Sequence, residues 1–235
     1  MLWTEFLNQA RQGISLNCIT VRTPSKLCWS DSCPFGLGGF LLSGRAWRIQ
    51  IPPLSPIHGV DIANNVLEFL AMLVTIWLTI LECDLEKCHQ ECILAMGDNT
   101  SAIGWLHKSG KLKPGSIYHA PVQLIARQTA RLLLRSSHCL ASQHIKGDEN
   151  IVSDLLSFAG NVRGYDHPLA LDLPSDTTLT QRFHDHLPQL IPEGFVISPL
   201  PSEISSFVIQ ALQMTESSLL LSKKNLTKSG TAPGD

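Results

Sequence analysis

Four acidic side chains could act together, and three of them stand where predicted strands end or predicted helices begin. Asp31 and Asp98 each follow a short apolar run that is typical of a buried strand. We expect Glu68 in the first turn of a long apolar helix, and Asp154 in a short helix near residue 150. Functional sites in open α/β sheets form at the carboxyl ends of strands. The acids can therefore meet if the strands of Asp31 and Asp98 are adjacent and the apolar helix crosses beside them.

Clustered carboxylates repel one another, and this repulsion restricts what such a site can do. The cluster is tolerable only if cations bind or if some of the carboxyl groups stay protonated. Hard cations such as Mg²⁺ prefer oxygen ligands. Two of them about 4 Å apart can activate the nucleophile, hold in-line geometry and neutralise charge during phosphodiester hydrolysis. The four acids therefore predict a two-metal hydrolytic site.

Each acid taken singly also has a purely structural interpretation. Glu68 stands three residues after Asn65, which is close to a capping box. Asp98 could cap the helix that follows it, Asp31 could shape a turn, and Asp154 could be a solvated helix residue. The occurrence of all four acids at suitable elements favours the metal site over these separate explanations.

The elements that must position the acids follow from the hydrophobic pattern. Three short strands with turns between them predict an antiparallel meander, and helices and strands alternate after it. The predicted strands cover about 27–31, 40–42, 47–51, 92–96 and 139–145, and the predicted helices cover 65–82, 100–107, 118–136 and a segment from about 150. This order, β-β-β-α-β-α-α-β-α, predicts a mixed α/β fold with helices packed on a mixed sheet.

Four segments in this order resemble the ribonuclease H domains of retroelement reverse transcriptases. They are CWSDS at 28–32 with GLGG at 36–39, NVLEFLA at 65–71, MGDNTSA at 96–102, and HIKGDENIVSDLLS at 144–157. The second is similar to the family's E-x-x-A helix, the third to its D-N-x-x-A segment, and the fourth to its ending H-I-x-G-x-x-N-x-x-A-D-x-L-S. The resemblance covers residues 26–158.

The resemblance implies a ribonuclease H-like fold and a metal-dependent ribonuclease. The expected sheet has five strands, with the first three antiparallel and the last two parallel. The family implies that Asp31, Glu68, Asp98 and Asp154 are catalytic ligands of two Mg²⁺ or Mn²⁺ ions, which cleave the RNA strand of an RNA–DNA hybrid. Two features depart from the family. Ser153 replaces its usual Ala, and the mobile His of the cellular branch is absent between Gly147 and Asn150.

The composition changes after about residue 160, where prolines recur. We divide the chain into a lead-in from an upstream reverse-transcriptase region at 1–25, a ribonuclease H-like domain at 26–160, and a tail at 161–235. The tail should hold a Pro-rich linker, one short amphipathic helix and a disordered end. That helix, of about twelve residues, carries the apolar stripe Ile204, Phe207, Val208, Ala211 and Leu212. We expect it to pack weakly or not at all on the preceding domain.

The tail sequence resembles the segment after ribonuclease H in polyproteins of tyrosine-recombinase (DIRS-like) retroelements. The resemblance therefore implies a reverse-transcriptase polymerase domain as partner in a parent polyprotein.

The stretch between Asp98 and Asp148 is rich in cations and contains no acid, although the whole chain has a net charge of −2. Its cations are Lys108, Lys111, Lys113, Arg127, Arg131, Arg135 and Lys146. The three arginines are four residues apart, so they should share one helix face. One interpretation is an ordinary solvated face. The other, favoured by the lack of balancing acids, is a surface that contacts the phosphates of a nucleic acid.

Composition and N-terminal sequence indicate an intracellular protein, cytoplasmic or nuclear. Hydrophobic residues make up 44% of the chain and charged residues 16%, which allows a core and argues against disorder. Seven cysteines without a regular framework favour reduced thiols. No signal peptide is visible, and the longest apolar run, 69–81, is too short to span about 30 Å of hydrocarbon. We therefore expect no membrane partner.

Three alternative functions remain open at this point. The first is a catalytically silent retroelement remnant with the same fold, which acts at most as a nucleic-acid or protein binding module. The second is a transposase or integrase nuclease, against which the fourth acid argues because those families use three. The third places the function in residues 160–235, as a protein-interaction module.

Overall fold

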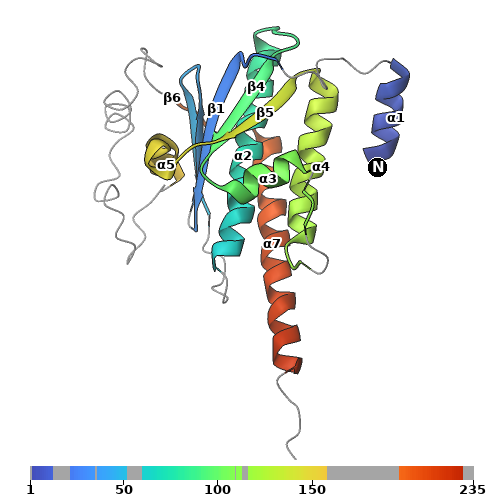
Figure 1. The fold of residues 1–235 in the computed structure, drawn as a ribbon, viewed down its shortest axis with the longest axis vertical. Coiled ribbons are helices and arrows are strands. Elements are labelled where there is room, and N and C mark those ends of the chain that lie inside the picture. Colours follow the sequence, from blue (N-terminus) through green and yellow to red (C-terminus); the bar gives the residue numbers. More distant parts are fainter. Residues whose placement is uncertain are drawn as a thin grey trace, which may run out of the picture.

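A mixed six-stranded sheet forms the centre of the part of the chain that the computed structural model describes, residues 2–12, 22–34, 36–51, 60–108, 110–112, 116–157 and 196–229 (Figure 1). The strands are β1 (Lys26–Cys33), β2 (Gly36–Leu41), β3 (Arg45–Gln50), β4 (Cys92–Gly97), β5 (Cys139–His144) and β6 (Val196–Ile197). Their order across the sheet is β5-β4-β1-β2-β3-β6. β1, β2 and β3 form the expected antiparallel meander, and β4 and β5 run parallel to β1.

The prediction of five strands is wrong by one. β6 adds to the outer edge of β3 in parallel, with Arg45 opposite Val196 and Ala46 opposite Ile197. A strand of two residues has too little periodicity to be recognised in the sequence. β1 also continues two residues past Asp31, because Ser32 and Cys33 still pair with β2 in a tight hairpin.

Helices cover both faces of the sheet. They are α1 (Leu2–Gln12), α2 (Val60–Leu85), α3 (Thr100–His107), α4 (His119–Ser136), α5 (Ile151–Ser157) and α7 (Ser202–Ser229). Figure 1 shows α5 on one side of the sheet and α2, α3, α4 and α7 on the other, with α1 beyond α4. The short 3-10 helix η2 (Gly147–Glu149) leads into α5.

The long helix α2 is the centre of the larger core. The mean hydropathy of its most apolar 18-residue window is 2.0, so length and composition alone would suit a membrane span, but 89% of that window is buried inside the protein. Its two interior threonines satisfy their hydroxyls locally, since Thr75 donates to the carbonyl of Ala71 and Thr79 to that of Thr75. Packing against the sheet, α4 and α7 therefore accounts for the apolar composition of α2.

A second, smaller core lies under α5. Val152, Leu155 and Leu156 of α5 pack on Phe40 and Ala46 of the meander. The sheet separates this cluster from the larger one, so α5 is held by a core of its own. This matters for function because α5 carries Asp154.

The C-terminal helix α7 differs from the expectation in both length and packing. It has 28 residues instead of about twelve. Ile204, Val208, Ala211 and Leu219 are fully or almost fully buried against the larger core, and Phe207 makes an edge contact with Trp77 of α2. The apolar stripe therefore belongs to the domain, and the predicted weak packing is wrong. Of the Pro-rich linker expected from 160 to 201, residues 160–195 lie outside the described residues, as do the last six residues of the chain, whereas the described end of the linker holds β6.

Candidate metal centre

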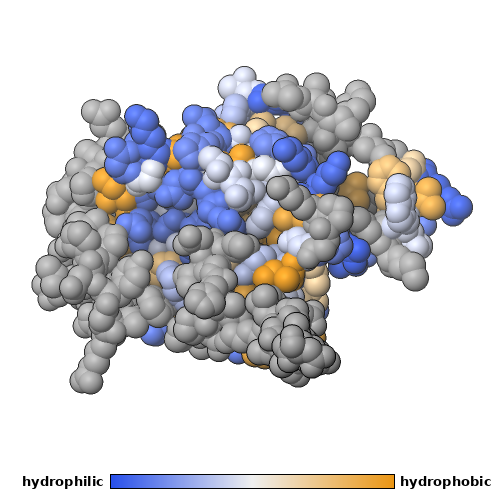
Figure 2. Space-filling model, turned by 60° about the horizontal axis from the view of Figure 1, so that its bottom comes forward, coloured by the Kyte–Doolittle hydropathy of each residue, from blue (hydrophilic) through white to orange (hydrophobic). Residues whose placement is uncertain are grey.

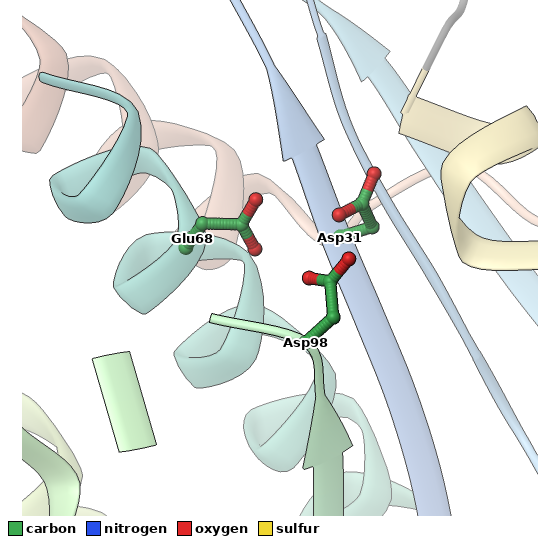
Figure 3. Close-up of side chains that lie close together, drawn as sticks. All are labelled: Asp31, Glu68 and Asp98. Atoms are coloured by element: carbon green, nitrogen blue, oxygen red, sulfur yellow. The ribbon is translucent and has the colours of Figure 1, made fainter. Parts of the chain in front are cut away.

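Three of the four predicted acids converge on one point. Asp31 lies in β1, Glu68 in α2, and Asp98 directly after β4. One carboxylate oxygen from each lies within 4.8 Å of the others. Figure 3 shows the three side chains directed toward a common space between the sheet and α2. Asp31 and Glu68 are buried, and Asp98 is partly exposed.

Strand register explains why Asp31 and Asp98 meet. β1 and β4 are adjacent and parallel, with Trp29 opposite Met96. Asp31 and Asp98 each stand two residues beyond this pair, so they come side by side at the carboxyl end of β4. The condition set from the sequence, that the two strands be neighbours, is confirmed.

Glu68 reaches the same point from the third turn of α2, not from its first turn. α2 begins at Val60, eight residues before Glu68. Asn65 therefore does not cap the helix. Its side-chain oxygen accepts a hydrogen bond from the Asn99 amide at 2.7 Å, which ties α2 to the segment after Asp98. The capping-box interpretation of Glu68 is wrong, because Asn65 is inside the helix.

Asp98 is likewise not a helix cap. Asn99 is the N-cap of α3, and its side-chain oxygen accepts from the backbone N–H of Ala102 at 3.0 Å. The Asp98 carboxylate is thus available to the cluster. Its backbone carbonyl lies 2.9 Å from Nε2 of His144, which fixes the backbone of Asp98 against the end of β5.

Burial and mutual repulsion raise the pKa values of the clustered acids. For Asp31, burial and the charge of Asp98 raise the pKa from 3.8 to about 7, although a hydrogen bond from Ser157 opposes the change. Burial raises the pKa of Glu68 well above its usual value, with added repulsion from Asp31 and Asp98. The pKa of Asp98 is raised by its burial and by the charge of Asp154. Without a cation, the cluster therefore holds protons near neutral pH.

Asp154 lies beside the cluster without joining the group of three. It is a half-buried residue of α5, and its charge raises the pKa values of both Asp31 and Asp98. Asp154 thus adds a fourth negative charge near Asp31 and Asp98. The described geometry brings together three of the four predicted acids, and Asp154 is connected to them through its electrostatic effect on Asp31 and Asp98.

Two glycines of β2 allow α5 to approach the sheet closely enough for this arrangement. A Cβ atom at Gly36 would lie 2.0 Å from the carbonyl oxygen of Ser157, and one at Gly38 would lie 2.4 Å from the backbone of Leu156. Neither position can accept a side chain unless α5 moves away. From the other end of the helix, the Asn150 amide donates to the carbonyl of Ser30 at 3.1 Å.

The donor set fits a divalent cation. The cluster offers only carboxylate oxygens, which are the ligands that Mg²⁺ and Mn²⁺ prefer. No lysine or arginine of the described residues forms an ion pair with Asp31, Glu68 or Asp98. A cation would thus stabilise the charged carboxylates, whose pKa values are raised first by burial and then by mutual repulsion. Asp31, Glu68 and Asp98 would hold the ion.

The predicted nucleic-acid contacts divide into two groups. Lys108, Lys111 and Arg127 are exposed and form no ion pair with an acid among the described residues. Arg131 and Arg135 instead face Glu5 of α1, at 3.1 and 3.6 Å. The expectation that the arginine face lacks balancing acids is therefore wrong for these two, because the acid comes from a distant part of the sequence. Lys113 lies outside the described residues.

Two side chains around the cluster were not predicted from the sequence. Ser157 donates to Asp31 and Asn150 to the carbonyl of Ser30. Both occur in the segment that resembles the family's ending, but a single serine or asparagine at the end of a helix has no periodicity that signals a role. Only the close approach of α5 to β1 gives them one.

No family model, no curated protein and no solved structure matches the chain. Any functional assignment therefore depends on the carboxylates, their surroundings and the four motifs.

Proposed function

We propose that this chain is a ribonuclease H-type endonuclease that hydrolyses the RNA strand of RNA–DNA hybrids with two divalent cations. The observation that carries the proposal is the convergence of Asp31, Glu68 and Asp98 from three different elements, with Asp154 beside them. All four acids lie in motifs that resemble those of one family, in that family's order. The six-stranded mixed sheet with helices on both faces is compatible with a ribonuclease H-like fold.

The residues of the chain have separable tasks in this reaction. The carboxylates hold Mg²⁺ or Mn²⁺, which would supply an activated water and stabilise charge on the leaving oxygen. Raised pKa values mean that cation binding must displace protons, so binding should weaken as the pH falls. Asn65, Asn99 and His144 fix the backbone segments that carry Glu68 and Asp98.

Substrate binding would depend on the phosphate backbone. Lys108 and Lys111 offer exposed positive charge directly after α3, and Arg127 offers it on α4. Contacts of this kind position a duplex without reading its sequence. Figure 2 shows a continuous hydrophilic area on the left half of the face in view, the side of the molecule where α5 and β1 lie in Figure 1. A polar surface suits a phosphodiester better than an apolar ligand. The minor groove and its 2′-hydroxyls would distinguish the RNA strand.

In a cell the domain would act within a retroelement reverse transcriptase, beside a polymerase domain, in the cytoplasm or nucleus. The tail's resemblance to DIRS-like polyproteins supports this context. We retain a second candidate, a catalytically silent remnant, because the chain departs from the cellular family at the loop before Asp154. Only Asp148 and Glu149 stand between Gly147 and Asn150, with no histidine. A remnant of this kind would bind metal and hybrid without cleaving.

A cleavage assay on an end-labelled hybrid tests the proposal. With Mg²⁺ or Mn²⁺ the protein should cut the RNA strand within the hybrid region, and it should leave the DNA strand and a DNA duplex of the same sequence intact. Chelation with EDTA should stop the reaction. The exposed Glu216 of α7 provides a control, since Glu216→Gln should cleave like the unaltered protein. Metal-dependent hybrid binding without cleavage would favour the silent remnant, and absence of both would reject the proposal.

A further inference from the structure

Ser157 stands at a junction between the cluster and α5. It is the last residue of α5 and is completely buried. Its hydroxyl donates to Oδ2 of Asp31 at 2.8 Å and also lies 2.9 Å from the carbonyl oxygen of Asp154. A hydroxyl has a single proton, so it favours one of these acceptors at a time. The carboxylate is the better acceptor whenever Asp31 is charged, because hydrogen bonds to ionised groups are about twice as strong.

The hydrogen bond from Ser157 distinguishes the two oxygens of Asp31. Figure 3 shows one oxygen of Asp31 directed toward Glu68 and Asp98, and the other directed away from them. Ser157 binds only Oδ2, so one hydrogen bond from α5 restrains the rotation of the Asp31 carboxylate. A carboxylate fixed in this way presents its other oxygen to a cation without losing rotational freedom on binding.

We propose that Ser157 is a positioning residue that orients Asp31 for the metal, and that the glycines of β2 exist to bring it there. The proposal rests on the proposed function, because it assumes that Asp31 binds a cation. α5 would then have two tasks, to carry Asp154 and to hold Asp31 in the orientation that binding requires. Partners that hydrogen-bond to metal ligands commonly change metal affinity about 10- to 100-fold when they are removed.

The same helix offers a matched control. Ser153 lies one turn before Ser157, is equally buried, and has no hydrogen-bond partner for its hydroxyl among the described residues. Ser153→Ala and Ser157→Ala therefore remove the same atom from the same helix at the same burial. Only the second removes a contact with Asp31, so a difference between the two variants reports the role of that contact.

The experiment is calorimetric titration of the full chain with Mn²⁺ at pH 7.5, together with thermal denaturation of each metal-free variant. We expect Ser157→Ala to bind Mn²⁺ about tenfold more weakly, and Ser153→Ala to bind like the unaltered protein. Ser157→Thr keeps the hydroxyl and should bind Mn²⁺ with the affinity of the unaltered protein. If Ser157→Ala does not fold, Ser157→Cys takes its place, because the thiol has nearly the same shape but donates only weakly.

The outcomes separate the proposals. Unchanged Mn²⁺ affinity in folded Ser157→Ala or Ser157→Cys, even with a lower melting temperature, means that Ser157 only stabilises the fold and overturns the inference while the metal centre stands. Equal weakening by Ser153→Ala would also overturn it, because the cause would then be the packing of α5. A wild-type protein that does not bind Mn²⁺ at all would reject both the inference and the proposed metal centre.

Discussion

The metal-free protein should lose stability as the pH rises through the range in which Asp31 ionises. The folded-state pKa of Asp31 is raised from 3.8 to about 7. Between these values the unfolded chain releases a proton that the folded protein keeps, so the free energy of unfolding falls with rising pH. Below pH 3.8 Asp31 is protonated in both the folded and the unfolded state, so its ionisation does not change the free energy of unfolding. Above pH 7 Asp31 lowers the free energy of unfolding by its full amount. Glu68, whose pKa is also raised, contributes in the same direction.

The size of this effect follows from the change in pKa. Each pH unit between the two pKa values corresponds to about 1.4 kcal/mol, so a rise from 3.8 to about 7 makes the Asp31 contribution about 4 kcal/mol. In a domain of this size 1 kcal/mol changes the melting temperature by about 2–4 °C. At pH 7.5 the melting temperature of the metal-free protein should therefore be roughly 10 °C lower than that of a variant without this carboxylate.

The assay is thermal denaturation in EDTA between pH 4 and pH 8, followed by circular dichroism. Asp31→Asn removes the titrating group while keeping a hydrogen-bond acceptor for Ser157, so its melting temperature should depend less on pH than that of the unaltered protein. Glu216→Gln, an exposed substitution on α7, should retain the full dependence. Added Mg²⁺ should raise the wild-type melting temperature most at high pH, since binding selects the charged form. If the pH profiles of wild type and Asp31→Asn run parallel, our explanation of the cluster is wrong.

Three further predictions concern the cluster, the C-terminal helix and the cationic surface. Asp98→Asn should abolish hybrid cleavage and leave the metal-free melting temperature level or higher, because one of several repelling charges is removed; cleavage at the wild-type rate would contradict the metal assignment. Ile204→Ala should lower the free energy of unfolding by about 2–5 kcal/mol, whereas Ile209→Ala on the exposed side of α7 should change it by less than about 0.5 kcal/mol. Denaturant titration measures both values, and equally small effects would mean that α7 does not pack on the domain. Arg127→Ala should reduce the slope of log hybrid affinity against log salt by about 0.9 for a B-form-like duplex, whereas Glu5→Gln should increase hybrid affinity because it releases Arg131 and Arg135 for phosphate. Fluorescence anisotropy in Ca²⁺ measures the hybrid affinity of both variants, and no change in either would place α4 outside the interface.

The sequence predicted the parts of the site that depend on strands and on residue spacing. Hydrophobic runs followed by Asp31 and Asp98 identified the two strands, and the end of the second one, although β1 continues to Cys33. The adjacency of these strands was a condition set from the sequence, and the structure met it. Strand periodicity is local, so a short apolar run that stops at an acid is visible in one sequence. The order of elements from β1 to α5 was predicted correctly for the same reason.

The start of α2 and the role of Asn65 could not be predicted in this way. Asparagine before an apolar run usually indicates a helix cap. Here its side chain bonds to Asn99, which is 34 residues away in the sequence and adjacent only in the folded protein. A tertiary contact therefore determines the role of Asn65, whereas its local sequence preference indicated a helix cap.

The packing of α7 and the ion pairs of α1 could not be predicted from the sequence for a related reason. The stripe on Ile204 and Val208 identified an apolar helix face correctly, but nothing in the sequence says which surface covers such a face. Glu5 lies more than 120 residues before Arg131, so the balance of charge within the cationic stretch could not reveal it. Long-range pairing of this kind needs the three-dimensional structure.

Anomalous diffraction from crystals soaked in Mn²⁺ tests the central claim, that the acidic cluster is a two-metal site, most directly. We expect two manganese peaks about 4 Å apart, one among Asp31, Glu68 and Asp98, and one shared with Asp154. Crystals of Asp98→Asn should lose at least one peak. A map with no manganese at these carboxylates, or with manganese only elsewhere on the protein, would contradict the account.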